Sequence, residues 1–519
     1  MVEKYSFITK FITPPNQSGN NMSEREIISA IKYVSRMKPE FMLSEIRNYI
    51  KSEMSTEEIY NIIQPKILDI GIDLLADADD FKVSRSPKGM IELSEDEIKK
   101  NNSFFSSPSV SRKLERLIEQ YIEKKAAKAW DDPRTIQKMR EAVVAQKSSY
   151  WKKSKSKKIK YEKGYHILGY LEYQFPVYFV QFQHILYKLA QQGLLKKRMK
   201  ILDVGTGAGT IPLSIIDFCN RLDDYQAIIH SIEKYDENIE AYRYLVPEYA
   251  AFKSRFVIED PIKSDIKKLD LAKIPDNIDL MVFSNVLNEL EGTNVDEKAD
   301  LVMQLSEKLS KDGNIIIIEP ADKVNSIEAR NLTIKLKARG LGIYGPCSFI
   351  WGAGCNPEKC WSFEQKQDIK LTRLMEAMAD CEDSYRFMNT DIKFTYAILR
   401  KDNVTEMKYH VPAKARFARF ADLKKHVDKH INVVCSLLSG DLGNEKNSLY
   451  KICDGTSRKP VYAVLPVHNV TEDNAILKTA KYGDIISINN VLVNYNSDTD
   501  SYNLLLGKGT HVDYMERNL

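Results

Sequence analysis

Short apolar runs recur from residue 199 to residue 400, and stretches of helical length separate them. The runs are "MKILDVG", "AIIHSIE", "SRFVIED", "IDLMVFS", "GNIIIIEP" and "IKFTYAILR". Apolar strands that alternate with helices are typical of a doubly wound α/β domain with a mainly parallel sheet. We therefore expect such a domain over residues 197–402.

The chain before this region has helical periodicity instead. A polar tail, residues 1–22, is expected to be flexible. Residues 23–100 hold several short amphipathic runs and then "FKVSRSPKGMIEL", in which apolar residues alternate around a Pro-Lys-Gly turn. Helices followed by a hairpin indicate a winged-helix-like module, with a helical packing domain as the alternative. Residues 108–196 are predicted to be mostly helical, with a break at Asp132-Pro133.

Beyond about residue 425 the pattern is all-β. The runs "HINVVCSLLS", "LYKICDG", "KPVYAVLPV", "DIISINNVLVNYN" and "YNLLLGKGTHV" are separated by Gly, Asn and Asp turns. They predict a small barrel over residues 425–519, and the last two resemble the later strands of an OB-fold. Such barrels bind single-stranded nucleic acid or serve as plain interaction modules.

Composition limits the class of protein. The 519 residues are 43% hydrophobic and 29% charged, which is ordinary for a folded protein, and the net charge of +4 is too small to indicate a nucleic-acid partner. We find no apolar run of about 18 residues and no signal-peptide core at the N-terminus. The expected location is therefore cytoplasmic, without a membrane partner.

Local charge is more informative than the total. Between Lys147 and Lys163 there are eight lysines against one acid, with tyrosine and tryptophan interleaved. A solvated linker is the usual explanation of such a run. Lysines alternating with aromatic residues also suit phosphate contact and base stacking, so an RNA-binding segment is the alternative.

The stretch "ILDVGTGAGT" points to a nucleoside cofactor. A strand is expected to end at Asp203, and Gly205, Gly207 and Gly209 then let the backbone turn tightly before a helix begins. An acid just ahead of the first glycine, here Asp203 with Val204 between them, is typical of methyltransferases that use S-adenosylmethionine. Dinucleotide enzymes place a pyrophosphate there, which an acid would repel. The pattern therefore favours S-adenosylmethionine, and a degenerate fold that binds nothing is the alternative.

Acids at the next two strand ends agree with this interpretation. Glu233 ends the second strand and can accept hydrogen bonds from both ribose hydroxyls. Glu259 and Asp260 end the third strand, where they could contact the adenine edge. We expect all of them at the carboxyl ends of the strands, where open α/β sheets bind ligands.

The fourth strand ends in "FSNVLNEL", at the position that faces the methyl sulfonium in methyltransferases. It lacks the Pro-Pro-aromatic motif typical of enzymes that methylate exocyclic or amide nitrogens. Asn285, Asn288 and Glu289 are candidates for contact with the cofactor or an acceptor, or for capping the next helix. No catalytic base can be assigned, although methyl transfer often proceeds by positioning alone.

Three of the seven cysteines fall in "CSFIWGAGCNPEKC", as Cys347, Cys355 and Cys360. The spacing matches neither a paired zinc knuckle nor a ferredoxin run. Three thiolates and one remote ligand could hold zinc or a [4Fe–4S] cluster. The alternative is that the three cysteines are unrelated loop residues that bind no metal.

The order of these motifs resembles the methyltransferase-like family associated with the mitochondrial small ribosomal subunit, which has bacterial and archaeal relatives. The likeness covers about residues 130–455 and includes "KYEKGYHILGYLEYQFPVYFVQFQHIL", "KILDVGTGAGT", "LMVFSNVLNEL", "IIIIEPAD" and "GPCSFIWGAGCNPEKCWSFEQ". Ordinary methyltransferases lack the cysteine loop, so the combination is specific.

The resemblance implies a class I methyltransferase fold and a [4Fe–4S] cluster on four cysteines, with zinc as the alternative. It implies Cys347, Cys355 and Cys360 as ligands and, through "HINVVC", nominates Cys435 as the fourth, with Cys453 and Cys381 as alternates. The gap between the first two cysteines is longer than the family's usual one.

The resemblance also implies a role on the small ribosomal subunit. The expected function is S-adenosylmethionine-dependent methylation of ribosomal RNA or assistance in its assembly. The alternatives are a non-catalytic RNA-binding assembly factor, and a zinc-containing methyltransferase for a protein or small molecule.

Overall fold

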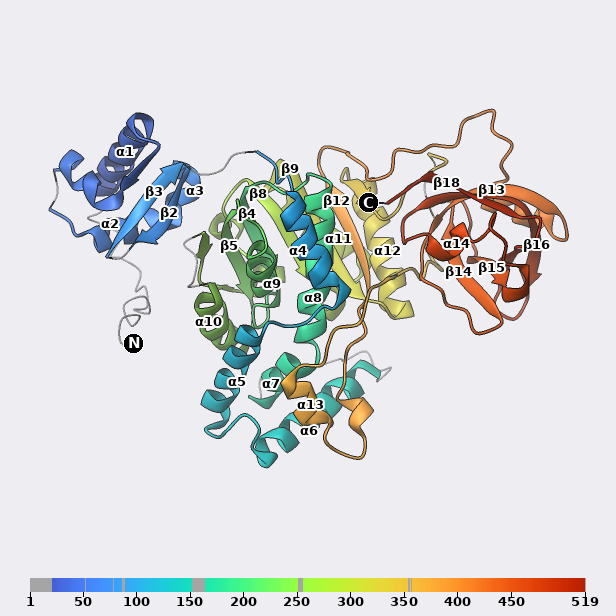
Figure 1. Cartoon of the computed structure of the whole chain (residues 1–519), viewed down its shortest axis with the longest axis horizontal. Helices are drawn as coiled ribbons and strands as arrows, with labels where there is room; N and C mark the ends of the chain where they lie inside the picture. The colour runs from blue at the N-terminus through green and yellow to red at the C-terminus, as the bar shows by residue number, and fades with distance from the viewer. Residues whose placement is uncertain are drawn as a thin grey trace.

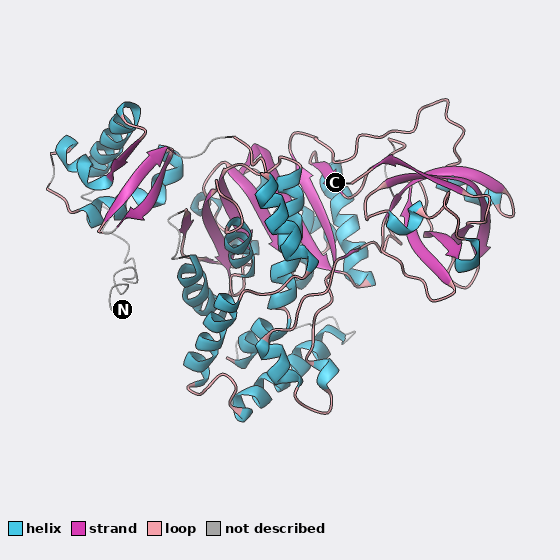
Figure 2. Ribbon diagram, in the orientation of Figure 1, coloured by secondary structure: helices cyan, strands magenta, loops and turns pink. Residues whose placement is uncertain are grey.

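The computed structural model describes residues 21–518 apart from 52, 78, 86–88, 152–163, 251–254, 353, 354 and 356. Residues 1–20 of the predicted tail and most of the lysine-rich segment after Lys147 lie outside the described residues, whereas Asn21 and Met22 already belong to the first helix. Figures 1 and 2 show an N-terminal module, a central α/β domain with a helical extension, and a C-terminal barrel side by side.

The central sheet has the strand order of class I methyltransferases. From one edge to the other it runs β6-β5-β4-β8-β9-β12-β10, parallel except that β12 is antiparallel to both neighbours. The bounds are β4 Arg198–Val204, β5 Gln226–Glu233, β6 Phe256–Ile258, β8 Ile278–Ser284, β9 Leu309–Pro320, β10 Gly342–Gly345 and β12 Lys393–Arg400. The predicted α/β fold is confirmed, although the periodicity missed the edge strand β10 and two short strands, β7 (Ile262–Lys263) and β11 (Glu364–Gln365).

Helices cover both faces of this sheet. Alternate residues of a strand point to opposite faces, so Leu280 and Val282 pack against one layer while Met281 and Phe283 pack against the other. The first layer consists of α8 Phe175–Gln191, α9 Thr210–Cys219 and α10 Asp236–Ala250, with α4 Glu95–Ser106 outside it; the second consists of α11 Val295–Ser306 and α12 Lys323–Ala338.

The predicted helical region forms an extension at the carboxyl end of the sheet. It comprises α5 Arg112–Ala126, α6 Pro133–Trp151 and α7 Tyr165–Tyr173, joined by α13 Arg373–Ala379. Asp132 ends the preceding turn and accepts hydrogen bonds from the Arg134 and Thr135 amides, which caps α6. The Tyr170 hydroxyl lies 2.8 Å from Thr210 Oγ1, so α7 covers the start of α9.

The N-terminal module has the helix-strand-helix-helix-strand-strand order of a winged helix. Its elements are α1 Asn21–Met37, β1 Glu40–Met42, α2 Thr56–Ile63, α3 Ile67–Ile70, β2 Ile72–Asp77 and β3 Asp80–Arg85, and the antiparallel sheet runs β1-β3-β2. Its core includes Ile228 and Val257 of the central sheet, so the module packs on the β5–β6 edge.

Two details of the N-terminal prediction are wrong. The hairpin is β2–β3 and turns between Asp77 and Asp80, not at the Pro-Lys-Gly sequence. Met90, after that sequence, forms a bridge with Lys196 instead, and Ile91 packs in the central core. Helix α4 therefore belongs with the central domain, although it begins within the range predicted for the module.

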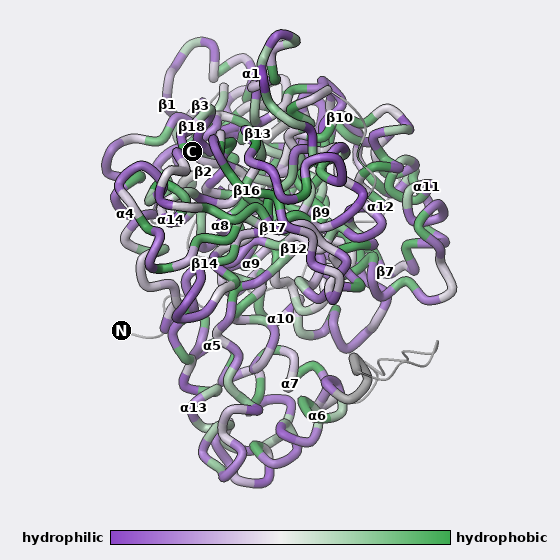
Figure 3. The backbone as a smooth tube through the Cα atoms, turned by 90° about the vertical axis from the view of Figure 1, so that its right-hand side faces the viewer, coloured by the Kyte–Doolittle hydropathy of each residue, from purple (hydrophilic) through white to green (hydrophobic). Residues whose placement is uncertain are grey.

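The C-terminal region is a closed five-stranded barrel with an OB-fold order. The strands pair in the order β13-β14-β15-β17-β16, and β16 closes the barrel by pairing with β13. Strands β15 and β17 are parallel, and α14 lies between β15 and β16 in the chain. The bounds are β13 His430–Leu437, β14 Asn447–Cys453, β15 Val461–Pro466, α14 Ile476–Thr479, β16 Ile485–Asn496, β17 Ser501–Leu505 and β18 His511–Glu516. The expected last strand is two strands, and Figure 3 shows apolar residues concentrated around β16.

None of the helices that the structure describes is long and apolar enough to cross a membrane.

Candidate functional site

The glycine loop lies between β4 and α9, as the sequence predicts. Gly205, Gly207 and Gly209 all have positive φ angles, of 75°, 57° and 91°. A Cβ on Gly205 would lie 2.5 Å from the Val286 side chain, and one on Gly209 would meet Val246. A Cβ on Gly207 would meet nothing within 4 Å, so the middle of the loop faces open space.

Glu233, at the end of β5, holds this loop. Its carboxylate accepts hydrogen bonds from the amides of Gly207 (2.8 Å), Lys234 (2.8 Å) and Tyr235 (2.9 Å). Burial raises the pKa of Glu233, and the bonds from these amides oppose the shift. A carboxylate has about four acceptor positions, and the Asn238 side chain also forms a hydrogen bond with Glu233, so this chain already fills about all of them.

Asp203, the acid before the first glycine, is 1% exposed at the end of β4. Burial raises the pKa of its carboxyl to about 7, and the charge of Glu233 adds to the shift, whereas a bond from Thr206 opposes it. A cationic ligand placed here would favour the ionised form.

The two acids after β6 differ in their surroundings. Asp260 is exposed and forms a two-point ion pair with Arg243, at 2.7 and 2.6 Å. Glu259 is partly buried, and burial raises its pKa. Of the pair, Glu259 is therefore the less solvated side chain.

The loop after β8 carries the candidate asparagines. Asn285 adopts a left-handed backbone conformation, with φ of 53°, and its amide donates to the Ile318 carbonyl at 2.8 Å. The side-chain oxygens of Asn285 and Asn288 are buried without a hydrogen-bond partner among the described residues. Buried acceptors left without a donor are costly, which indicates that a ligand or water satisfies them.

Glu319 also lies in this loop region, and sequence reasoning missed it. Its Oε1 accepts from the amides of Leu287 (3.2 Å) and Asn288 (3.3 Å), whereas its Oε2 has no partner among the described residues. Burial raises the pKa of Glu319 well above its usual range, with the charge of Lys298 opposing. An acid within the apolar run "IIIIEP" was the available signal.

Two tyrosines, Tyr170 of α7 and Tyr178 of α8, complete this end of the sheet. Burial is the main cause that raises the pKa values of Tyr170 and Tyr178, and the charge of Glu289 contributes to both. Asp203 also acts on Tyr170, and Glu319 acts on Tyr178. Helices α7 and α8 thus place phenols beside the acids at the strand ends.

The donors and the open space beside Gly207 fit S-adenosylmethionine. Asp203 offers a carboxylate for the amino group, Glu233 fixes the glycine loop from the end of β5, and the unsatisfied asparagine oxygens face the same strand ends. Such a site can bind and orient a methyl donor without an assigned base.

The cysteine loop follows β10, and its thiols meet the barrel. Cys355 lies within electrostatic range of Cys347 and Cys360, and Cys453 of β14 lies within range of Cys355 and Cys360. Burial raises the pKa of Cys355 to about 12, and the neighbouring thiols add to the shift. The four cysteines therefore share one neighbourhood.

The Cys435 side chain points into the barrel core and not toward the other thiols. It is fully buried in the barrel core with Val433 and Leu437, and its thiol interacts with Asp454. Its neighbour Ser436 pairs with Cys453 across β13 and β14, so Cys453 shares the face opposite to that of Cys435. Cys381 lies after α13, where its thiol donates to the Met378 carbonyl.

Two buried cations adjoin the shared thiols. Arg330 of α12 is 2% exposed and donates to Ser362 Oγ, the Tyr396 carbonyl and the Tyr482 hydroxyl, all of them uncharged groups. Burial lowers its pKa, but Tyr482 and the thiols Cys347 and Cys360 outweigh that effect, so the pKa is raised. Lys451 of β14 is also buried; its pKa is lowered by burial, against the opposing effect of Cys360 and Cys453.

Four thiols beside two buried cations fit an anionic metal–thiolate group in donor type and charge. Within the described part of the chain, no three or more His, Cys, Asp or Glu side chains are arranged as a metal site. The chemistry of the donors fits, whereas their present arrangement is not that of a closed site.

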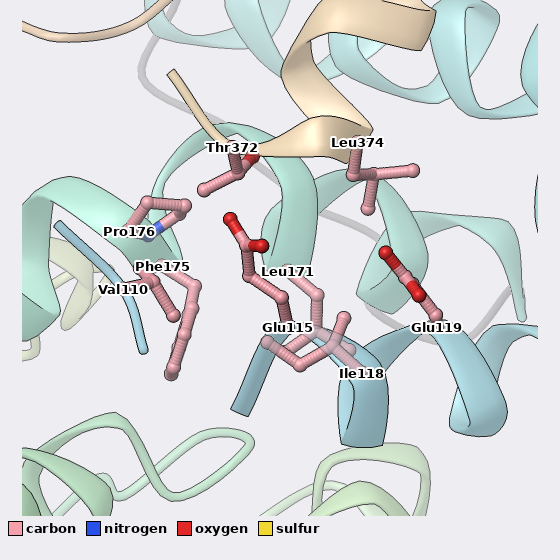
Figure 4. A pocket seen from close by; sticks show the side chains of 9 residues that line it. All are labelled: Val110, Glu115, Ile118, Glu119, Leu171, Phe175, Pro176, Thr372 and Leu374. Carbon is pink, nitrogen blue, oxygen red and sulfur yellow. The ribbon is translucent and has the colours of Figure 1, made fainter. Parts of the chain in front are cut away.

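A separate pocket lies between α5, α7, α8 and α13 (Figure 4). Apolar residues and the carboxylates Glu115 and Glu119 line it, and those acids form ion pairs with Arg112 (2.7 Å) and Arg373 (3.1 Å). Its charges are thus already paired, and the glycine loop does not contribute to it.

Comparisons with solved structures find methyltransferases at low identity. CcbJ methyltransferase from Streptomyces caelestis is 18% identical over 27% of this chain and 48% of its own, about half its length, with a TM-score of 0.19. Magnesium protoporphyrin IX methyltransferase from Synechocystis with bound S-adenosylhomocysteine is 10% identical over 42% and 83%, with a TM-score of 0.25. The fold assignment therefore rests on the strand order described above. No curated protein matches the chain.

Three family matches cover most of the chain. Residues 24–78 and 421–515 match the N- and C-terminal domains of a paired domain of unknown function, DUF8157. Residues 164–443 match the family described as mitochondrial small ribosomal subunit Rsm22, and they include the glycine loop and the cysteine loop. This match covers more than half of the 519 residues, so the chain belongs to the Rsm22 family.

Proposed function

We propose that this protein binds S-adenosylmethionine and a [4Fe–4S] cluster and acts, as a methyltransferase or an assembly factor, on the RNA of the small ribosomal subunit. The observation that carries the proposal is the combination of a class I sheet, an open glycine loop and a four-thiol neighbourhood in a member of the Rsm22 family. Asp203 and Glu233 would hold the cofactor's amino acid and ribose, and the asparagine loop would face its methyl group.

Within the ligand set we propose Cys453 as the fourth ligand in place of Cys435, together with Cys347, Cys355 and Cys360. The bound cluster would supply a structural link, and Arg330 and Lys451 would balance its charge. Zinc on the same thiols is the alternative. Iron counting and absorbance near 400 nm on anaerobically purified protein distinguish the two, and colourless protein with one zinc per chain would contradict the cluster.

A non-catalytic assembly factor is the second candidate. The observation that favours it is Glu233, whose carboxylate is mostly occupied by backbone amides of this chain. Calorimetric titration of S-adenosylmethionine into the metal-loaded protein separates the two: binding supports a working cofactor site, and no heat at millimolar ligand supports the second candidate.

The affinity for S-adenosylmethionine is expected to fall as the pH drops below about 7. Asp203, with a pKa of about 7, is then protonated and cannot pair with the cofactor's ammonium group. The expected loss approaches tenfold per pH unit below the pKa. Titrations from pH 5.5 to 8.5 measure it; Asp203→Asn should flatten the profile, and Asp276→Asn, an exposed partner of Lys308, should not. An unchanged profile for Asp203→Asn would exclude this role.

Gly205→Ala is expected to weaken cofactor binding at least tenfold. The new Cβ would lie 2.5 Å from Val286, so the loop must move. Gly193→Ala is the matched control, since Gly193 also has a positive φ (65°) but open space around it. Both changes should cost about 1 kcal/mol of stability from the left-handed backbone, and only Gly205→Ala should raise the dissociation constant. Equal affinities for the two variants would place the cofactor elsewhere.

A further inference from the structure

The segment between the central domain and the barrel concentrates positive charge. We define the strap as residues 408–430, which include the 3-10 helix Phe420–His426. It holds seven Lys or Arg residues against two acids, Asp422 and Asp428, together with three histidines. The basic residues are Lys408, Lys414, Arg416, Arg419, Lys424, Lys425 and Lys429. Its net charge of +5 exceeds the +4 of the whole chain, so the remainder of the protein is slightly acidic.

All seven basic side chains of the strap are exposed. Among the described residues, Lys425 is the one strap cation in an ion pair, with Asp422 at 2.6 Å. Arg419 lies over the ring of Trp351 in the cysteine loop, 4.6 Å from its centre. The other five form no ion pair within the part of the chain that the structure describes, although Lys429 Nζ also donates to the Lys425 carbonyl at 3.3 Å, and their charges are therefore available to an external anion.

Backbone contacts fix the strap in place. Its amides at Lys408 and Tyr409 donate to the Glu516 carboxylate, and Val411 donates to the Ile350 carbonyl at 2.9 Å. Farther on, Phe420 donates to Asp454 at 2.8 Å. Figure 1 shows this segment crossing from the end of β12 to the start of β13. The cations are thus mounted on an anchored backbone.

The barrel lacks this charge. Residues 431–519 contain eight Lys or Arg residues against ten acids, so the OB-like barrel is slightly acidic. Electrostatic attraction to phosphates supplies most of non-specific nucleic-acid affinity. The barrel is the element expected to hold RNA, but the positive charge that attracts phosphates lies on the strap.

The burial of the strap's large apolar side chains helps to distinguish a nucleic acid from a lipid surface as its partner. Phe420 and Leu423 are buried, and Val411, Phe417 and Val427 are partly buried. None of them is free to insert into a lipid surface, whereas exposed cations such as Lys414 and Arg416 can pair with phosphates.

We propose that the strap is a binding surface for the phosphate backbone of RNA. This inference rests on the proposed function, which supplies the class of partner. The anchored cations would grip the RNA across the junction between the central domain and the barrel.

The test compares two variants with equal loss of charge. One replaces Lys414, Arg416, Lys424 and Lys429 of the strap with glutamine. The control replaces four exposed barrel lysines with glutamine, namely Lys446, Lys478, Lys481 and Lys508. Binding of a fluorescein-labelled 20-nucleotide oligouridylate to metal-loaded full-length protein is followed by anisotropy from 50 to 200 mM KCl. A third variant, with Lys and Arg exchanged at the strap positions, keeps the charge.

We expect the strap variant to bind at least tenfold more weakly at 50 mM KCl. The slope of log affinity against log salt should fall by about 3, because each lost phosphate contact on a single strand removes about 0.7. The control and the charge-keeping variant should bind like the unmodified protein.

Equal binding by the strap variant and the control would overturn this inference and leave the proposed function standing. Failure of the unmodified protein to bind RNA would overturn both. Binding to vesicles containing 30% phosphatidylserine, but not to oligouridylate, would assign the strap to lipid and overturn the inference as well.

Discussion

Replacing Cys453 with serine is expected to remove the metal group from the protein, whereas Cys435→Ser is expected to retain it. Cys453 lies within electrostatic range of Cys355 and Cys360, and Cys435 lies inside the barrel core. A serine hydroxyl is a poor replacement for a thiolate ligand, and loss of one ligand of four leaves an open, labile site.

Iron and zinc content per chain, measured after anaerobic purification, gives the answer directly. We expect at least a fivefold fall in metal for Cys453→Ser and a change within error for Cys435→Ser. Cys219→Ser controls for the loss of a buried thiol, since Cys219 packs in the core of the central domain. If Cys453→Ser retains its full metal content and Cys435→Ser loses metal, then Cys435 is the fourth ligand and our assignment is wrong.

Arg330→Met is expected to destabilise the metal-loaded protein by about 3–5 kcal/mol, the usual cost of leaving a buried charge without its partner. Arg330 donates only to uncharged groups, and the thiols Cys347 and Cys360 act on its charge. If those thiols hold an anionic group, removing Arg330 leaves that charge unbalanced.

Metal-free protein provides the control, because its thiols would be protonated. There the same change removes a buried cation without a charged partner, and we expect it to be neutral or stabilising. Urea unfolding of both forms measures the difference. Equal destabilisation with and without metal would show that Arg330 acts through its hydrogen bonds alone.

The sequence predicts the central fold well because buried parallel strands are continuous apolar runs. β4, β8 and β9 stand out for this reason, and the glycine loop falls directly after β4 as expected. β10 was missed because it is a four-residue edge strand flanked by glycines, "GIYG". The position of the hairpin was also predicted wrongly, because Pro-Lys-Gly is a stronger local turn signal than the sequence from Asp77 to Asp80. The pairing of β2 with β3, which the sequence does not show, places the turn at the second position.

The sequence predicts those residues of the candidate site that lie at the ends of strands. It does not predict those whose position depends on strand register or on packing between distant elements. Asp203 and Glu233 fall at the loop because Glu233 ends β5 and Asp203 is the last residue but one of β4. A shift of one residue turns a side chain to the other face of a strand, so "HINVVC" alone could not show that Cys435 points into the barrel. Contacts between distant elements, such as those of Tyr170, leave no local pattern.

The central claim is that this protein acts on RNA of the small ribosomal subunit. Ultraviolet crosslinking of the tagged full-length protein in cells, followed by sequencing of the recovered RNA, tests it most directly. We expect small-subunit ribosomal RNA to be enriched over large-subunit RNA and messenger RNA, at a few defined positions. Recovery of no RNA, or of RNA without enrichment of the small subunit, would contradict it.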